Sequence, residues 1–130
     1  MRKDILLGFR NLAFFYNDID SLDATYENIS ENIQLIDVRT FREFEITGTL
    51  KGAYKIPLTT EDGMVLRDEF VSDVLKSGID IEKPIHIICR SGVRSRKATK
   101  ILRQNGFKNV INLNGGILKL YMDGYRNFVK

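Results

Sequence analysis

A chain of 130 residues has the usual length of one domain and can bury a core without disulfide bonds or a structural metal ion. The single cysteine, Cys89, excludes an internal disulfide, and the single histidine, His86, leaves no set of Cys and His residues with zinc-ligand spacing. We expect no metal or other cofactor and no membrane-spanning segment, and Arg10 and Asn11 interrupt the apolar run that a secretory leader would need. A reducing cytoplasm fits this composition best.

The charges are divided unevenly along the chain. Residues 1–82 carry nine Lys and Arg against sixteen Asp and Glu, whereas residues 83–130 carry eleven against one. Because residues 83–122 contain no acidic side chain, we expect a positive potential around Cys89 that attracts small anions. The basic residues at 96–103 also suit the solvent face of a helix. Nucleic-acid binding is not expected, since no aromatic interleaving or recognised motif accompanies the charges.

Four apolar runs rich in β-branched residues predict strands, and helical patterns alternate with them. In chain order we predict a helix at 22–29, a strand at 34–38, a helix at 41–46, a strand at 53–56, a helix at 69–77, a strand at 85–88, a helix at 96–105 and a strand at 110–113. Thr40 and Glu43 form a Thr-x-x-Glu capping box. Gly78 and Gly106 suit the ends of two later helices. The alternation indicates a parallel α/β sheet, in which ligands bind beyond the carboxyl ends of the strands.

Residues 1–17 are predicted to form an N-terminal extension, and residues 18–130 a single domain. Ile5, Phe9 and Leu12 share one face of a helical pattern in the extension. Such a face packs on the same domain or on a partner, which includes a second copy of the chain in a homodimer. A role at a membrane surface is a further alternative.

Cys89 follows the predicted strand at 85–88 and begins a basic loop. The loop consists of Cys89, Arg90, Ser91, Gly92, Val93, Arg94 and Ser95. Backbone N–H groups of such a loop can point at the sulfur, and Gly92 permits the tight path. A helix start stabilises an anion by about 0.3–1 kcal/mol, and by up to about 2 kcal/mol when it is partly buried. A lone cysteine is usually a small buried apolar residue, but this loop favours a nucleophilic thiolate.

The chain resembles the rhodanese, or sulfurtransferase, family over roughly residues 19–128. The motifs that carry the resemblance lie, in order, at 35–40, 43–44, 48–57, 89–94, 106–110 and 113–117. Thr49 stands where the family commonly has a histidine, and Leu120 or Tyr121 stands where a tryptophan usually packs. The resemblance implies a single rhodanese domain with a central parallel sheet of about five strands, flanked by helices on both faces.

The resemblance also implies a two-step sulfur transfer. The Cys89 thiolate attacks the outer sulfur of a small anionic donor such as thiosulfate, sulfite leaves, and a cysteine persulfide forms. A small thiol, cyanide or a protein thiol then accepts the sulfur. Neither step needs a general base, because the nucleophile is already ionised and sulfite leaves without a proton. We therefore expect His86 to be a structural residue of its strand.

The other expected site residues surround Cys89. Arg90 and Arg94 are candidate anion anchors, because a guanidinium stays charged and matches an oxyanion, although either could be a surface charge. The remaining residues of the anion-binding loop are Ser91, Gly92, Val93 and Ser95. Asp37 and Arg39 end their strand beside the loop, where they either support its geometry or form a purely structural pair. Glu43 is expected to cap its helix rather than take part in the chemistry.

Loop length argues against the phosphatases and arsenate reductases that share this fold. Those enzymes use a Cys-x5-Arg loop, whereas four residues lie between Cys89 and Arg94, so the loop is one residue too short to surround a phosphate. Two alternatives to a thiosulfate sulfurtransferase stay open: a carrier that relays a persulfide between proteins, and a docking module in which Cys89 is idle. Arg90 favours thiosulfate over mercaptopyruvate, whose enzymes usually have a small uncharged residue after the cysteine.

Overall fold

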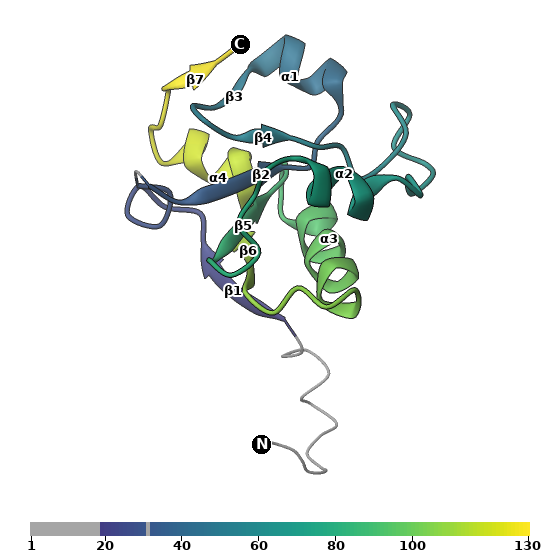
Figure 1. The fold of residues 1–130 in the computed structure, drawn as a ribbon. Coiled ribbons are helices and arrows are strands. Elements are labelled where there is room, and N and C mark those ends of the chain that lie inside the picture. Colours follow the sequence, from purple (N-terminus) through teal and green to yellow (C-terminus); the bar gives the residue numbers. More distant parts are fainter. Residues whose placement is uncertain (1–18, 31) are drawn as a thin grey trace, which may run out of the picture.

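The structure, a computed structural model, describes residues 19–30 and 32–130 (Figure 1). The predictions for residues 1–17 therefore lie outside the described residues. The elements are β1 (Asp20–Asp23), β2 (Gln34–Asp37), α1 (Phe41–Thr47), β3 (Thr49–Leu50), β4 (Tyr54–Lys55), α2 (Phe70–Lys76), β5 (Ile85–Ile88), α3 (Val93–Gln104), β6 (Val110–Asn114), α4 (Gly116–Met122) and β7 (Phe128–Val129).

Five parallel strands form the central sheet in the order β1-β6-β5-β2-β4. β5 lies in the middle, and all four of its residues are buried. Its apolar run is nearly continuous because helices cover both faces of the sheet. The short strands β3 and β7 pair antiparallel in a separate two-stranded sheet. The predicted α/β fold, with about five parallel strands and helices on both faces, is confirmed.

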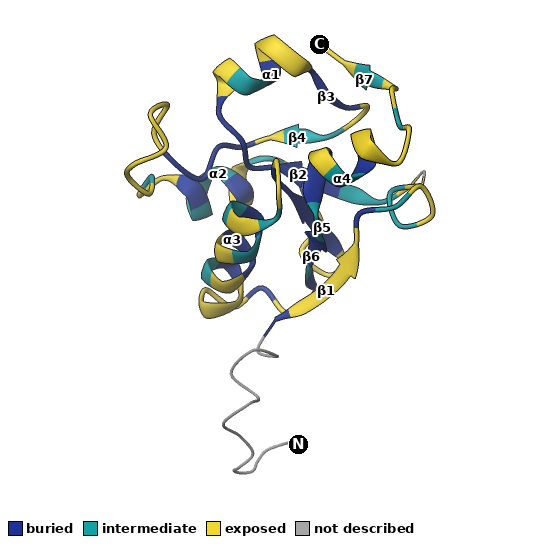
Figure 2. Cartoon of the chain, turned by 180° about the vertical axis from the view of Figure 1, so that it is seen from behind, coloured by how far each residue is buried: buried dark blue, intermediate teal, exposed yellow. Residues whose placement is uncertain are grey.

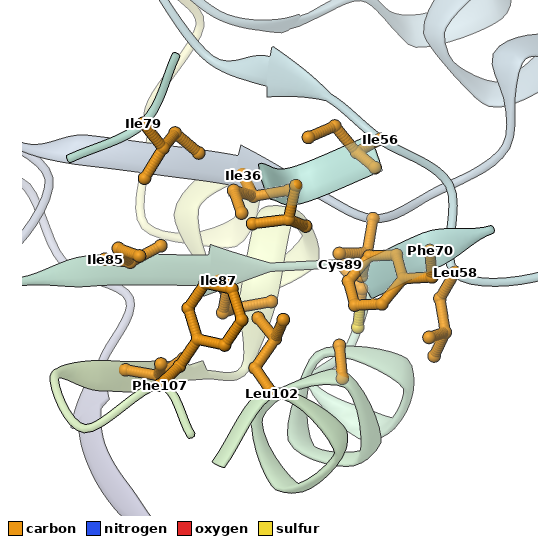
Figure 3. Packing of buried hydrophobic residues seen from close by; sticks show 14 residues of the cluster. Ile36, Ile56, Leu58, Phe70, Ile79, Ile85, Ile87, Cys89, Leu102 and Phe107 are labelled. Carbon is orange, nitrogen blue, oxygen red and sulfur yellow. The ribbon is translucent and has the colours of Figure 1, made fainter. Parts of the chain in front are cut away.

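Two apolar clusters hold the helices against the sheet. Successive residues of β5 point to opposite faces: Ile87 packs with side chains of α2 and α3, whereas Ile88 packs with side chains of α4. Figure 1 shows α3 and α4 on opposite sides of the sheet, and Figure 2 shows that the buried segments gather between them. Figure 3 shows the larger cluster, to which Phe70 of α2, Leu102 of α3 and Cys89 all belong.

The carboxyl ends of the central strands meet at one edge of the sheet. Asp37 at the end of β2 is in register with Ile88 of β5, and Ile87 is in register with Asn112 of β6. Cys89 comes directly after β5 and therefore lies between the ends of β2 and β6. This is the edge at which the sequence predicts a ligand site.

The predicted helix at 22–29 is wrong. Residues Asp20–Asp23 form β1, which pairs with β6, and the backbone N–H of Asn28 donates to Thr25 in a turn. β1 is an edge strand whose four residues are all exposed. It therefore lacks the apolar run that reveals a buried strand in a sequence, and pairing with its neighbour decides its conformation.

The other predicted elements are present with small shifts at their ends. β5 covers the predicted strand at 85–88, and α1 has the predicted capping box between Thr40 and Glu43. α3 begins at Val93, earlier than the predicted residue 96, so the last residues of the loop are already helical. In the described part of the chain, no helix is long and apolar enough to cross a lipid bilayer.

Candidate active site

The side chain of Cys89 is almost fully buried at the point where β5 turns into α3. The backbone N–H of Gly92 donates to Cys89 Sγ at 3.0 Å, and the Cys89 thiol donates to Ser95 Oγ at 3.4 Å. Gly92 has a left-handed φ of 106°, and a Cβ there would lie 3.1 Å from the backbone N of Gly115. The tight turn predicted at Gly92 is present, and it brings one backbone N–H to the sulfur.

The first turn of α4 holds the beginning of the loop. The backbone N–H of Ile117 donates to the carbonyl of Cys89, and that of Leu118 donates to the carbonyl of Arg90, both at 2.9 Å. This close approach requires Gly116, because a Cβ there would collide with the carbonyl oxygens of Cys89 and Arg90. Gly116 therefore allows α4 to approach the loop closely enough to fix the backbone of Cys89.

A row of buried polar side chains runs from Cys89 to β6. Ser95 Oγ donates to Asn112 Oδ1 at 2.6 Å, and Asn112 Nδ2 donates to Asn114 Oδ1 at 2.9 Å. Ser95 and Asn112 are both buried, so these bonds satisfy polar groups that water does not reach. Asn112 was not predicted as a site residue. The signal that could have found it is an amide inside an apolar, buried strand.

Arg94 is held by Glu43 of α1. Its Nη1 and Nη2 donate to the two carboxylate oxygens of Glu43 at 2.6 and 2.9 Å. Burial alone would raise the pKa of Glu43, but hydrogen bonds from Arg94 and Thr40 and the charge of Arg94 outweigh burial and lower the pKa to about 2. The hydrogen bond with Glu43 raises the pKa of Arg94. Glu43 caps its helix as predicted and, in addition, compensates the charge of the candidate anion anchor.

The charges near Cys89 are more balanced than residues 83–122 alone predict. Glu43 and Asp37 come from the acidic first part of the chain, and both interact electrostatically with Arg94. Cys89 also interacts electrostatically with Arg94. The fold thus brings two carboxylates to the loop that no local sequence window contains.

Asp37 and Arg39 form a buried ion pair beside the loop. Arg39 Nη2 donates to Asp37 Oδ2 at 2.8 Å, and its Nε lies 3.1 Å from both carboxylate oxygens. The guanidinium also donates to Thr47 Oγ1 and to the carbonyl of Gly48. Thr49 Oγ1 donates to Asp37 Oδ2 at 2.6 Å. These bonds join the end of β2 to the end of α1. Support of the loop by this pair stays a prediction.

Arg90, Ser91 and Val93 are the exposed residues of the loop. Arg90 lines a cavity of about 480 Å³ together with Glu43 and with side chains of α1, α4 and β7. The cavity therefore adjoins the loop on the side of the sheet covered by α4. This position is compatible with Arg90 as an anion anchor, a role that stays a prediction.

His86 is buried within β5. Burial lowers its pKa, which favours the neutral imidazole, and its Nδ1 has no hydrogen-bond partner among the described residues. No hydrogen bond in the described part of the chain joins it to the Cys89 loop. This placement suits the structural role predicted for His86.

Comparison with known proteins places the chain in a family. A model of the rhodanese-like domain matches residues 21–123. The chain belongs to the rhodanese-like family. The matched segment includes the complete loop 89–95 and the residues Asp37, Arg39 and Glu43, so the geometry described above is that of a rhodanese domain.

Three similar proteins illustrate the range of this family. Uncharacterized protein YqhL of Bacillus subtilis is 40% identical over 86 residues, covering 66% of this chain and 59% of that protein. The tRNA uridine(34) hydroxylase of Buchnera aphidicola is 31% identical over 130 residues, covering 95% of this chain and 39% of that protein. The solution structure of the polysulfide-sulfur transferase homodimer of Wolinella succinogenes has a TM-score of 0.61 and 33% identity, covering 83% of this chain and 77% of that chain. This chain thus spans less than two thirds of the length of both curated relatives.

Proposed function

We propose that this rhodanese domain transfers sulfane sulfur from thiosulfate, or a related small anionic donor, to a thiol or cyanide through a persulfide on Cys89. Membership of the rhodanese-like family supports a sulfurtransferase-type activity in general. The observation that carries the proposal is the position of Cys89 Sγ, which follows the central strand and accepts the Gly92 N–H at the start of α3.

Atoms and electrons balance in both steps of the transfer, and Cys89 is the only residue that forms a covalent bond to the transferred sulfur. The Cys89 thiolate attacks the outer sulfur of thiosulfate, a new S–S bond forms, and sulfite leaves with the electron pair of the old S–S bond. An acceptor thiolate or cyanide then attacks the outer sulfur of the persulfide and restores the thiolate. The positive end of α3 and the charge of Arg94 stabilise the sulfur anion before and after the first step.

A persulfide carrier that relays sulfur between proteins is the second candidate function. Exposed apolar side chains near the loop favour it: Val93 in the loop is 75% exposed, and Ile46 on α1 is 62% exposed. Exposed apolar side chains that gather beside a reactive group suit contact with another protein. Both candidates use the same persulfide on Cys89 and differ in the molecule that supplies or accepts the sulfur.

The intact mass of the purified protein tests the persulfide directly. After incubation with thiosulfate, we expect the wild-type protein to gain the mass of one sulfur atom and to lose it again with a thiol reductant. Cys89→Ser should gain no sulfur while its circular dichroism spectrum stays that of the wild type. Absence of the gain in wild-type protein whose thiol still reacts with iodoacetamide would contradict transfer from thiosulfate.

A further inference from the structure

The charges of the site largely cancel one another. Arg39 pairs with Asp37 at 2.8 Å, and Arg94 pairs with Glu43 at 2.6 Å. Arg90 is exposed, and no carboxylate of the described residues pairs with it. The loop and its supporting residues therefore carry one uncompensated positive charge. Ionisation of the cysteine to its reactive thiolate balances even that charge.

An apolar cavity adjoins this weakly charged site. Its volume of about 480 Å³ suits the body of a small organic molecule. Its charged lining consists of Arg90 and of the two paired residues Arg39 and Glu43. The apolar side chains that line it come from three elements and include Ile46 of α1, Leu118 and Tyr121 of α4, and Phe128 of β7. Because Leu118 is bonded through its backbone to the carbonyl of Arg90, this wall has a fixed position relative to the loop. Thiosulfate has no apolar part that could use it.

We propose that the site selects sulfane-sulfur donors with a single negative charge and an apolar body, such as organic thiosulfonates, over the thiosulfate dianion. This inference rests on the sulfur transfer proposed above and specifies its donor. Glu43 determines the charge preference, because its carboxylate holds the guanidinium of Arg94 by two hydrogen bonds. The cavity determines the preference for an apolar body.

An organic thiosulfonate, R–SO2–S⁻, donates sulfur with the same balance as thiosulfate. The Cys89 thiolate attacks the outer sulfur, the bond between the two donor sulfurs breaks, and the sulfinate R–SO2⁻ leaves with the electron pair. The single negative charge of the donor leaves with the sulfinate, and the persulfide keeps the charge of the thiolate. No oxidant, reductant or other reactant is needed.

Glu43→Gln tests the charge preference. The interaction energy of two charges is proportional to their product. Removing the negative charge of Glu43 therefore lowers the interaction free energy of a dianionic donor with the site by twice as much as that of a monoanionic donor. We expect kcat/KM to rise about tenfold for thiosulfate and about threefold for benzenethiosulfonate, so that their ratio shifts about threefold. Gln keeps the oxygen that the capping box needs. The ratio also cancels any change in cysteine reactivity that both donors share.

Glu45→Gln is the matched control for the charge. This variant also removes one carboxylate charge from α1, but at an exposed position. Glu43, and not Glu45, forms the ion pair with Arg94. The ratio of the two donors should stay that of the wild type in this variant.

Leu118→Ser tests the cavity. Loss of the apolar contact should raise the KM for benzenethiosulfonate about three- to tenfold, because one apolar contact contributes on the order of 1 kcal/mol, and should change the KM for thiosulfate much less. Leu75→Ser is the control, since Leu75 is 57% exposed on α2 and does not line the cavity. Methanethiosulfonate, which has the same charge but almost no apolar body, should respond to Leu118→Ser much less than benzenethiosulfonate.

The outcomes separate this inference from the function on which it rests. If both donors place sulfur on Cys89 but Glu43→Gln leaves their ratio unchanged, or Leu118→Ser affects both alike, the donor preference is overturned and sulfur transfer stands. If neither donor places sulfur on Cys89 in the wild-type protein, the proposed function fails and the donor preference fails with it.

Discussion

Glu43 shows how one side chain can serve two parts of the structure. Its carboxylate accepts the backbone N–H of Thr40 at the start of α1 and, at the same time, the guanidinium of Arg94 from α3. The first contact is three residues away in the sequence and the second is 51 residues away. The local contact orients the carboxylate, and the distant contact joins α1 to the cysteine loop.

This double role predicts a dependence of stability on pH. The pKa of Glu43 is about 2 in the folded protein and has its usual value of 4.5 in an unfolded chain, so the unfolded chain binds more protons between these values. The stabilisation from the carboxylate is therefore complete above 4.5 and is lost as the pH falls towards 2. Urea unfolding from about pH 6 to about pH 2.5 should show the stability difference between wild type and Glu43→Gln shrinking. A difference that stays constant over this range would show that the carboxylate charge contributes nothing.

The start of α4 holds the backbone of the loop that begins at Cys89. α4 has seven residues, and its first backbone N–H groups bind the carbonyls of Cys89 and Arg90 instead of remaining unpaired. Gly116 makes this contact possible through a φ of 61° and the absence of a Cβ. Two properties of glycine, backbone freedom and small size, are used together at this position.

Gly116→Ala should therefore harm the site more than its backbone conformation alone explains. Gly124 also has a positive φ, but nothing lies within 4 Å of a Cβ placed there, so Gly124→Ala should show only the left-handed cost of roughly 1–2 kcal/mol. Gly116→Ala should destabilise more and slow persulfide formation about tenfold or more, because the loop carbonyls must move. Urea unfolding and the rate of sulfur gain by mass spectrometry measure both effects. Equal effects of the two variants would exclude a steric role for Gly116.

The whole molecule brings the acidic and basic parts of the chain together around one sheet. Arg103 of α3 pairs with Asp20 of β1 at 3.6 Å, and Arg94 pairs with Glu43. The larger apolar cluster includes residues from β2, α2, β5 and α3, and it also includes Cys89. Cys89 is thus part of the core, so the position of its sulfur depends on the packing of the domain.

The buried face of α2, rather than its exposed face, should supply most of the stability that this helix contributes to the domain. Phe70 is 1% exposed within the cluster that contains Cys89, so Phe70→Ala should destabilise the domain by about 3–5 kcal/mol. Leu75→Ala on the same helix removes a side chain that is 57% exposed and should cost less than about 0.5 kcal/mol. Urea unfolding of both variants measures the two losses in the free energy of unfolding. Similar costs would mean that α2 is held by something other than its buried face.

Local patterns in the sequence predict most of the sheet and the reactive loop. The apolar run of β5 predicts a strand because both faces of the central strand are buried, and the Thr40–Glu43 pair predicts the start of α1 because capping contacts span three residues. The loop after β5 predicts a reactive Cys89, since the cysteine, the glycine and the helix start are adjacent in the chain. Each of these features depends on neighbours that the sequence itself places side by side.

Features that depend on distant neighbours could not be predicted in this way. The exposed residues of β1 form a strand only because they pair with β6 at the edge of the sheet. Asn112 belongs to the candidate site only because Ser95 of α3 donates a hydrogen bond to it. The charge of Arg94 is compensated only because the fold brings Glu43 to it. The residue types and order of the chain therefore define the fold and indicate Cys89 as the candidate nucleophile, whereas three-dimensional packing defines the charge around Cys89, because ion pairs between distant residues leave no local pattern.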